Sequence, residues 1–97
     1  MNNDGFPILN ISDIPLYEEI DKLHEETDEF IYALNKLNKS EEDLKATIEN
    51  IIEEFYDIVQ VMVNILYEQD LIHLMEDGLN KHIEKMKARD WDIVEYI

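Results

Sequence analysis

The sequence predicts an all-α fold, in which an antiparallel hairpin of two helices is followed by a third helix. Only two glycines and two prolines interrupt the 97 residues, whereas helix-forming Glu, Leu, Ile and Lys are frequent. Apolar residues recur every three or four positions along three segments, which is the spacing of one helix face. The segment 58–67 is apolar on more than one side, so we expect an oligomeric helix bundle that buries it against two neighbours.

Charge and composition limit the classes of partner and compartment. The chain has 24 acidic and 8 basic residues, a formal net charge of −16, which disfavours binding to bare nucleic acid or to an anionic membrane surface. The absence of cysteine excludes disulfides and thiolate metal sites and suits a reducing cytosol. Residues 1–5 lack the features of a signal peptide, and the longest uncharged run, 58–67, is too short to span a bilayer. We therefore expect a soluble, cytoplasmic protein.

The first helix is expected to follow an N-terminal arm. Residues 1–11, with Gly5, Pro7 and several asparagines, are expected to be extended. Ser12 or Asp13 is predicted to cap a helix that has a proline in its first turn, where a missing N–H is no loss, and that ends near residue 38. Its predicted core stripe consists of Ile20, Leu23, Thr27, Phe30 or Ile31, Leu34 and Leu37.

A turn at residues 38–40 is expected to lead into the second helix. Ser40 and Asp43 form an acidic variant of the capping box, so the helix is predicted to extend from Glu41 to about Gln69. The predicted core face of this helix is an apolar stripe at steps of three and four residues. It consists of Ile48, Ile52, Phe55, Val59, Met62 and Leu66.

The third helix is expected to begin after Asp70 as its cap. Gly78 weakens this helix by about 1 kcal/mol relative to alanine, so a break there is an alternative. We expect one helical domain over residues 12–89, followed by an apolar segment, 90–97, that packs on the bundle or on a neighbouring subunit. The predicted buried line of the third helix is Leu71, Met75, Leu79, Ile83 and Met86.

A second stripe on the second helix carries carboxylates. Glu54 and Asp57 share this stripe with Asn50 and, one turn later, with the aliphatic Val61 and Ile65. A solvated acidic face does not usually continue as an aliphatic one. The pattern therefore predicts two carboxylates at the edge of packed protein, where like charges are unfavourable unless they share a cation or a proton.

The first helix repeats this pattern. Glu25-Glu26-x-x-Glu29 is echoed by Glu53-Glu54-x-x-Asp57, and each motif precedes an apolar residue. Carboxylates three positions apart lie on one helix face, so two such pairs on antiparallel helices would surround a common centre. Oxygen-only ligands favour Mg²⁺, with Mn²⁺ as an alternative, over zinc or copper. The expected substrate is a metal-bound polyphosphate whose phosphoanhydride is hydrolysed by an activated water.

Basic residues are concentrated near the end of the third helix. Lys81, Lys85 and Arg89 recur every four residues and therefore lie along one side of that helix. They could meet a phosphate tail opposite the metal. An equally good explanation is that cations are favoured near the negative end of a helix dipole.

Together these features resemble the MazG-like all-α nucleoside triphosphate pyrophosphohydrolases, over residues 20–89. The family includes dimeric dUTPases, dCTP pyrophosphatases and phosphoribosyl-ATP pyrophosphohydrolases, so the resemblance implies cleavage between the α and β phosphates by a homodimer or homotetramer. This chain departs from the family at Tyr56, where a small residue is common, and at Lys85, where asparagine is common. The resemblance implies Glu26, Glu29, Glu54 and Asp57 as Mg²⁺ ligands, Glu25 or equally Glu53 as the residue that orients or deprotonates water, and Lys81, Lys85 and Arg89 as phosphate contacts.

Two other functions remain open. A non-catalytic acidic helical protein could bind a basic partner or mimic nucleic acid by its charge, and it would display carboxylates broadly without special sensitivity at four positions. A protein of the same fold could also use the carboxylates only to bind metal. Nothing in the first helix identifies a pocket for a base, so the nucleobase is left open.

Overall fold

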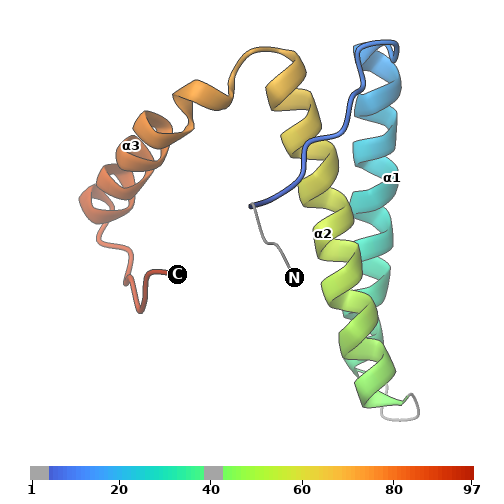
Figure 1. The fold of residues 1–97 in the computed structure, drawn as a ribbon. Coiled ribbons are helices and arrows are strands. Elements are labelled where there is room, and N and C mark those ends of the chain that lie inside the picture. The colour runs from blue at the N-terminus through green and yellow to red at the C-terminus, as the bar shows by residue number, and fades with distance from the viewer. Residues whose placement is uncertain (1–4, 39–42) are drawn as a thin grey trace.

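The computed structural model describes residues 5–38 and 43–97, and its regular elements are all helical. Helices α1 (Leu16–Asn35) and α2 (Leu44–Glu68) lie side by side and run in opposite directions, with a short 3₁₀ turn, η1 (Lys36–Asn38), at the end of α1 (Figure 1). A second 3₁₀ turn, η2 (Ile72–Leu74), leads into α3 (Met75–Ala88). The described ranges contain no strand, which confirms the prediction of an all-α protein.

The start of α1 differs from the prediction. Pro15 is the N-cap, with φ −61° and ψ 146°, and no side chain caps the helix, so the prediction of Ser12 or Asp13 as the cap was wrong. The physical reason is that a residue preceding proline is disfavoured in the helical region. Ile14 therefore stays outside the helix, and helical geometry begins only at Leu16.

The start of α2 also differs from the prediction. Asp43 is extended, with ψ 109°, and its carboxylate accepts a hydrogen bond of 3.1 Å from the backbone N–H of Lys45. Asp43 is therefore the N-cap, and α2 begins at Leu44 instead of Glu41. The predicted partner Ser40 lies outside the described residues.

Helices α2 and α3 end with the same backbone motif. Asp70 and Asp90 adopt left-handed conformations, with φ of 58° and 55°. In each case the next N–H donates to the carbonyl five residues earlier, at 2.8 Å for Leu71 and 3.0 Å for Trp91, which completes a Schellman motif. The prediction that Asp70 caps the third helix was wrong, because it closes α2 and Leu74 precedes α3.

The inner face of α2 is the stripe that carries carboxylates. Thr47 and Val61 are buried on this face, and Glu54 between them is partly buried. The stripe predicted as the core face, which includes Ile48 and Ile52, is largely exposed in the single chain, so that prediction was wrong for an isolated molecule. The reason is that, among the described elements, α1 covers one side of α2, whereas no other helix packs along the stripe that contains Ile48 and Ile52.

On α1, too, the observed inner face differs from the predicted one. Its two buried residues are Glu19 and Ala33, whereas Ile20, Ile31 and Leu34 are exposed. The exposed apolar residues of α1 therefore lie beside its inner face and not on it. The predicted core stripe of α1 is displaced by part of a turn from the stripe that packs on α2.

Helix α3 stands apart from the α1–α2 pair (Figure 1). Within the described part of the chain its only neighbouring element is η2, and none of its residues is buried. The predicted line from Leu71 to Met86 is therefore exposed or only partly buried in the single chain. Gly78 lies inside α3 without breaking it, and Val94 and Tyr96 in the segment that follows are exposed.

The N-terminal arm, residues 5–14, runs along α2 (Figure 1). The side-chain amide of Gln60 donates a hydrogen bond of 2.9 Å to the carbonyl of Pro7, and the N–H of Leu9 donates one of 2.9 Å to Oδ1 of Asn64. Ile11 is buried where the arm approaches α1. Across the described residues, no helix combines the length and apolar character needed to cross a membrane.

Candidate metal centre

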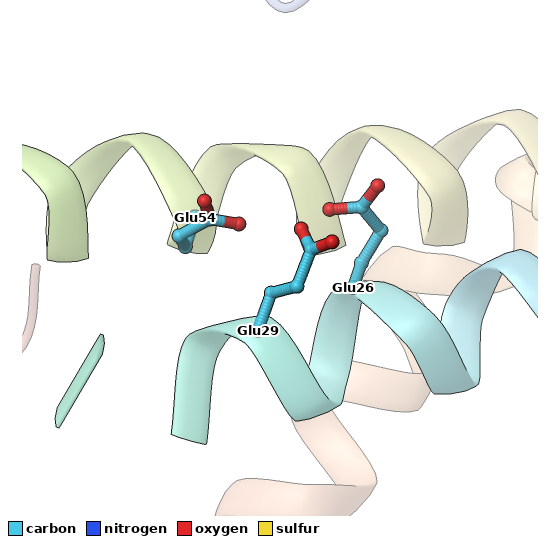
Figure 2. Close-up of side chains that lie close together, drawn as sticks. All are labelled: Glu26, Glu29 and Glu54. Atoms are coloured by element: carbon cyan, nitrogen blue, oxygen red, sulfur yellow. The ribbon is translucent and has the colours of Figure 1, made fainter. Parts of the chain in front are cut away.

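Three carboxylates converge where α1 and α2 face each other. Glu26 and Glu29 project from α1 toward Glu54 on α2 (Figure 2). Each offers one carboxylate oxygen, and these three oxygens lie within 4.8 Å of one another. Antiparallel packing brings the two sequence motifs to the same level of the helix pair, so residues far apart in the chain become neighbours.

Two of these carboxylates each have one oxygen that is shielded from water. Glu26 and Glu54 are partly buried, and Oε2 of each is inaccessible to solvent and has no hydrogen-bond partner. Glu29 is exposed. A buried carboxylate oxygen without a partner is unfavourable, because it has lost hydration without replacement.

Burial and neighbouring negative charges raise the pKa values of Glu26 and Glu54. Burial is the largest cause that raises the pKa of Glu26, and the negative charges of Glu29, Asp57 and Glu54 raise it further. The pKa of Glu54 is also raised, first by burial, then by the charges of Glu29 and Asp57 and by a hydrogen bond with Glu29. The free carboxylates therefore hold protons more tightly than isolated glutamates.

The remaining predicted acidic residues border this group. Asp57 is exposed and its oxygens are not among the three that converge, but its charge raises the pKa of both Glu26 and Glu54. Glu25 has the same effect on the pKa of Glu26, and Glu53 on that of Glu54. The structure thus brings three predicted ligands together and places the other acidic residues around them.

The chemistry of the donors fits a hard divalent cation. The group offers only carboxylate oxygens, which Mg²⁺ and Mn²⁺ prefer, and it contains none of the nitrogen or sulfur donors that favour zinc or copper. A cation at this position would place a positive charge beside the two partly buried carboxylates. It would also relieve the mutual repulsion that raises their pKa values.

The predicted phosphate contacts lie elsewhere in the single chain. Lys81, Lys85 and Arg89 are exposed residues of α3 and its C-cap, and α3 does not contact α1 or α2 in the described structure. The guanidinium of Arg89 lies 5.7 Å from the centre of the Trp91 ring. The fold of one chain therefore does not bring this basic side of α3 to the carboxylates.

Glu19 was not among the residues predicted from the sequence. This residue is only 2% exposed, and its Oε2 has no hydrogen-bond partner. It precedes Glu26 by seven residues, or two helical turns, and therefore lies on the same inner face of α1. That spacing was the available signal, because it places Glu19 on the same face of α1 as the predicted ligand Glu26.

Aromatic rings continue from the carboxylates to the arm. Phe30 and Phe55, which directly follow Glu29 and Glu54, have ring centres 6.4 Å apart. Phe55 meets Tyr56 edge to face at 5.3 Å. These contacts form an aromatic cluster beside the carboxylates, and its outer end reaches the N-terminal arm.

Comparison with known proteins adds no family assignment. No protein-family model matches the chain, and neither curated proteins nor solved structures gave a significant match. The function proposed below therefore rests on the two acidic motifs and on the geometry of their carboxylates.

Proposed function

We propose that this chain is a Mg²⁺-dependent nucleoside triphosphate pyrophosphohydrolase, with Mn²⁺ as an alternative metal. It would convert a nucleoside triphosphate and water into a nucleoside monophosphate and pyrophosphate. The observation that carries this proposal is the convergence, within 4.8 Å, of carboxylate oxygens from Glu26, Glu29 and Glu54 on two helices. Two of these residues also have buried oxygens that lack any partner.

Four residues would hold the metal. Glu26, Glu29 and Glu54 would provide the converging oxygens, and Asp57 at the edge would complete the set. The bound cation would neutralise charge on the phosphates and make the attacking water more acidic. Without the cation, the carboxylates would repel a triphosphate.

The chain itself would position and deprotonate the water. Glu25 borders the ligand group on α1, and Glu53 has the corresponding position on α2. In the proposed step the water oxygen bonds to phosphorus while the bridging α–β bond breaks. The proton of the water passes to one of these carboxylates, and pyrophosphate and the monophosphate are released.

The arrangement of apolar surface favours a homodimer or homotetramer. Exposed apolar residues of α1, such as Ile31, and of α2, such as Ile52, lie beside the inner faces of the two helices. Two such hairpins could bury these surfaces in a helix bundle. In such an assembly α3 of one chain could bring Lys81, Lys85 and Arg89 to the carboxylates of another. We assign such an oligomer to the cytoplasm, given its acidic, cysteine-free sequence.

A second function has one observation in its favour. In the described ranges the one contact within ion-pair distance joins His73 and Asp70 at 3.7 Å, and it is an ion pair only when His73 is protonated. Most carboxylates of this chain of net charge −16 are therefore not neutralised. Such a surface could bind a basic partner without catalysis. In that case removing one carboxylate at the centre would matter no more than removing one elsewhere.

The test is pyrophosphate release from a panel of ribo- and deoxyribonucleoside triphosphates, with Mg²⁺ and with EDTA. We expect release together with the matching monophosphate only when metal is present. Glu54→Gln should lower the rate by about a hundredfold or more, since it removes a charged ligand. The matched control is Glu49→Gln, an exposed carboxylate on the same helix, which should retain the wild-type rate.

Two results would contradict the proposal. One is full activity in Asp57→Asn after contaminating phosphatases have been excluded. The other is no release across the panel from protein shown by circular dichroism to be folded and by titration to bind Mg²⁺. The second result would favour the acidic interaction protein.

A further inference from the structure

We propose that a hollow between α1 and α2 binds the terminal phosphates of the substrate through Lys36, Thr47 and Asn50. This inference rests on the proposed function and names the part of the chain that selects a triphosphate. The hollow has a volume of about 320 Å³ and lies where the end of α1 meets the start of α2. The described residues that line it are Lys36, Ala46, Thr47 and Asn50.

The lining of the hollow matches an anion. Lys36 offers an ammonium group, Thr47 a hydroxyl and Asn50 a side-chain amide, and all three can donate hydrogen bonds. None of the described lining residues is acidic, although the chain has 24 acidic residues. A phosphate group has acceptor oxygens and negative charge, so it fits these donors better than a metal cation or a basic side chain does.

Thr47 is the buried member of this set. It is 7% exposed, and in the described part of the chain its hydroxyl forms no hydrogen bond. The hydroxyl of Thr27, by contrast, donates to the carbonyl of Leu23 at 2.7 Å, one helical turn earlier. A bound phosphate oxygen would give the Thr47 hydroxyl a partner.

The charge of Lys36 is available to a ligand. Its ammonium lies 4.9 Å from the centre of the Tyr32 ring, a contact that holds the side chain without cancelling its charge. In the described ranges Lys36 forms no ion pair, since the one contact within ion-pair distance joins His73 and Asp70. Lys36 is also half-buried, so its attraction for an anion is screened less than that of a fully exposed lysine.

The hollow adjoins the metal centre along the same edges of both helices. Lys36, the C-cap of α1, follows Glu29 by seven residues. On α2, Asn50 precedes Asp57 by seven residues and Glu54 by four, so Asn50 and Glu54 are neighbours at about 5–6 Å between Cβ atoms. Seven residues are two helical turns, a rise of about 10 Å along one edge. Because the helices are antiparallel, both shifts run toward the same end of the pair (Figure 1).

A polyphosphate can therefore occupy both places at once. With its α-phosphate at the metal, its β- and γ-phosphates would extend toward Asn50 and Lys36, one to two turns away. Lys36 would then neutralise charge on the pyrophosphate that leaves. A single phosphate at the metal does not reach the hollow, so this subsite favours triphosphates. It also supplies a cation from the same chain as the carboxylates, whereas the basic side of α3 would have to come from a partner.

The test uses the full chain with Mg²⁺ and inorganic tripolyphosphate, with binding measured by calorimetry. We expect Lys36→Ala to weaken binding by about tenfold, as for loss of one charge-assisted hydrogen bond. Thr47→Val removes only the hydroxyl and should weaken binding by about threefold. Lys36→Arg keeps the charge and should retain binding. The matched control is Lys45→Ala, which removes an exposed lysine from the first turn of α2 and should have no effect. Circular dichroism checks that each variant is folded.

A parallel assay of pyrophosphate release from nucleoside triphosphates separates this inference from the proposed function. If Lys36→Ala and Thr47→Val selectively weaken tripolyphosphate binding but the wild type releases no pyrophosphate, the subsite is supported and the pyrophosphohydrolase is not. If the wild type releases pyrophosphate but Lys36→Ala binds tripolyphosphate as tightly as the wild type does, only the subsite is overturned. Equal losses in Lys36→Ala and Lys45→Ala, or failure of the wild type to bind tripolyphosphate, also overturn it.

Discussion

Carboxylate oxygens that are buried and without a partner lie on the inner face of the α1–α2 pair. In the described part of the chain they belong to Glu19, Glu26 and Glu54. Each is unfavourable in a folded protein, because burial removes the water that would solvate it. Glu26 and Glu54 belong to the proposed metal centre, whereas Glu19 lies two turns away and has no role in the proposed reaction.

Replacing Glu19 should therefore stabilise the fold. We expect Glu19→Met to raise the free energy of unfolding by about 1–2 kcal/mol, because it removes an unpartnered buried oxygen and keeps a side chain of similar length. Urea titration followed by circular dichroism measures the change. Glu18→Met, at an exposed neighbouring position, should stay within about 0.5 kcal/mol of the wild type. Destabilisation by Glu19→Met would mean that its carboxyl group makes a contact that the fold needs.

Glu26 and Glu54 should make the metal-free chain less stable as the pH rises. Their pKa values in the folded state are raised above the ordinary 4.5, so the folded state binds protons more tightly than the unfolded state. This stabilisation is fully present below pH 4.5 and is lost as the pH rises through the raised pKa values. Thermal unfolding in EDTA, measured as a function of pH, should show the decline.

The double variant Glu26→Gln, Glu54→Gln isolates this contribution from the general acidity of the chain. Its stability should decline less steeply with pH than that of the wild type. At neutral pH, Mg²⁺ should stabilise the wild type and leave the variant unchanged, since metal and proton compete for the same oxygens. Equal pH dependence in the two proteins would show that these carboxylates do not interact as described.

At the scale of the elements, helical periodicity predicted which carboxylates share a helix face, because that depends only on local spacing. It placed Glu26 and Glu29 on one face of α1 and Glu54 on a packed face of α2, and these residues do converge. Periodicity did not predict which of two apolar stripes packs inward, because that choice depends on how many neighbours a helix has. Nor did it predict the contact between Leu9 and Asn64, which are 55 positions apart in the chain.

The direction of α3 depends on one backbone conformation that sequence patterns did not reveal. Asp70, with φ 58°, ends α2 in a left-handed turn. Aspartate tolerates this region better than most residues, but glycine has no steric penalty there. The sequence pattern therefore predicted Asp70 as the cap of the third helix, whereas this residue ends α2.

Substitution of Asp70 tests this turn. We expect Asp70→Gly to stabilise the protein by about 0.5–1 kcal/mol, since it also removes a negative charge from the negative end of α2. Asp70→Ala should be about 1 kcal/mol less stable than Asp70→Gly, because a Cβ is unfavourable at positive φ. Chemical denaturation compares the three proteins. Equal stability of the alanine and glycine variants would contradict a left-handed residue 70.

The whole molecule is extended for its length. Its radius of gyration is 16.6 Å, whereas a compact domain of 97 residues has about 12.5 Å. The separation of α3 from the α1–α2 pair accounts for this shape (Figure 1). The exposed apolar surfaces of the three helices are what a second chain would cover in the proposed oligomer.

A charge on the apolar side of α2 should dissociate that oligomer. Light scattering coupled to size exclusion should show at least a dimer for the wild type. Ile52, which is 53% exposed in the single chain, would be buried between subunits, so Ile52→Glu should weaken association by at least about tenfold. Gln69→Glu adds the same charge at the exposed end of α2 and should not weaken association. A monomeric wild type, or equal effects of both variants, would contradict this assembly.

The separation of α3 has a kinetic consequence in the proposed oligomer. Only residues 69–74 connect α3 to α2, so α3 remains tethered close to any chain that docks on its own α1–α2 pair. Once that first contact has formed, docking of α3 on the same partner is intramolecular, with an effective concentration in the millimolar range. Both contacts must then break at the same time before the chains separate. We therefore expect subunits to exchange much more slowly than the strength of either contact alone would indicate.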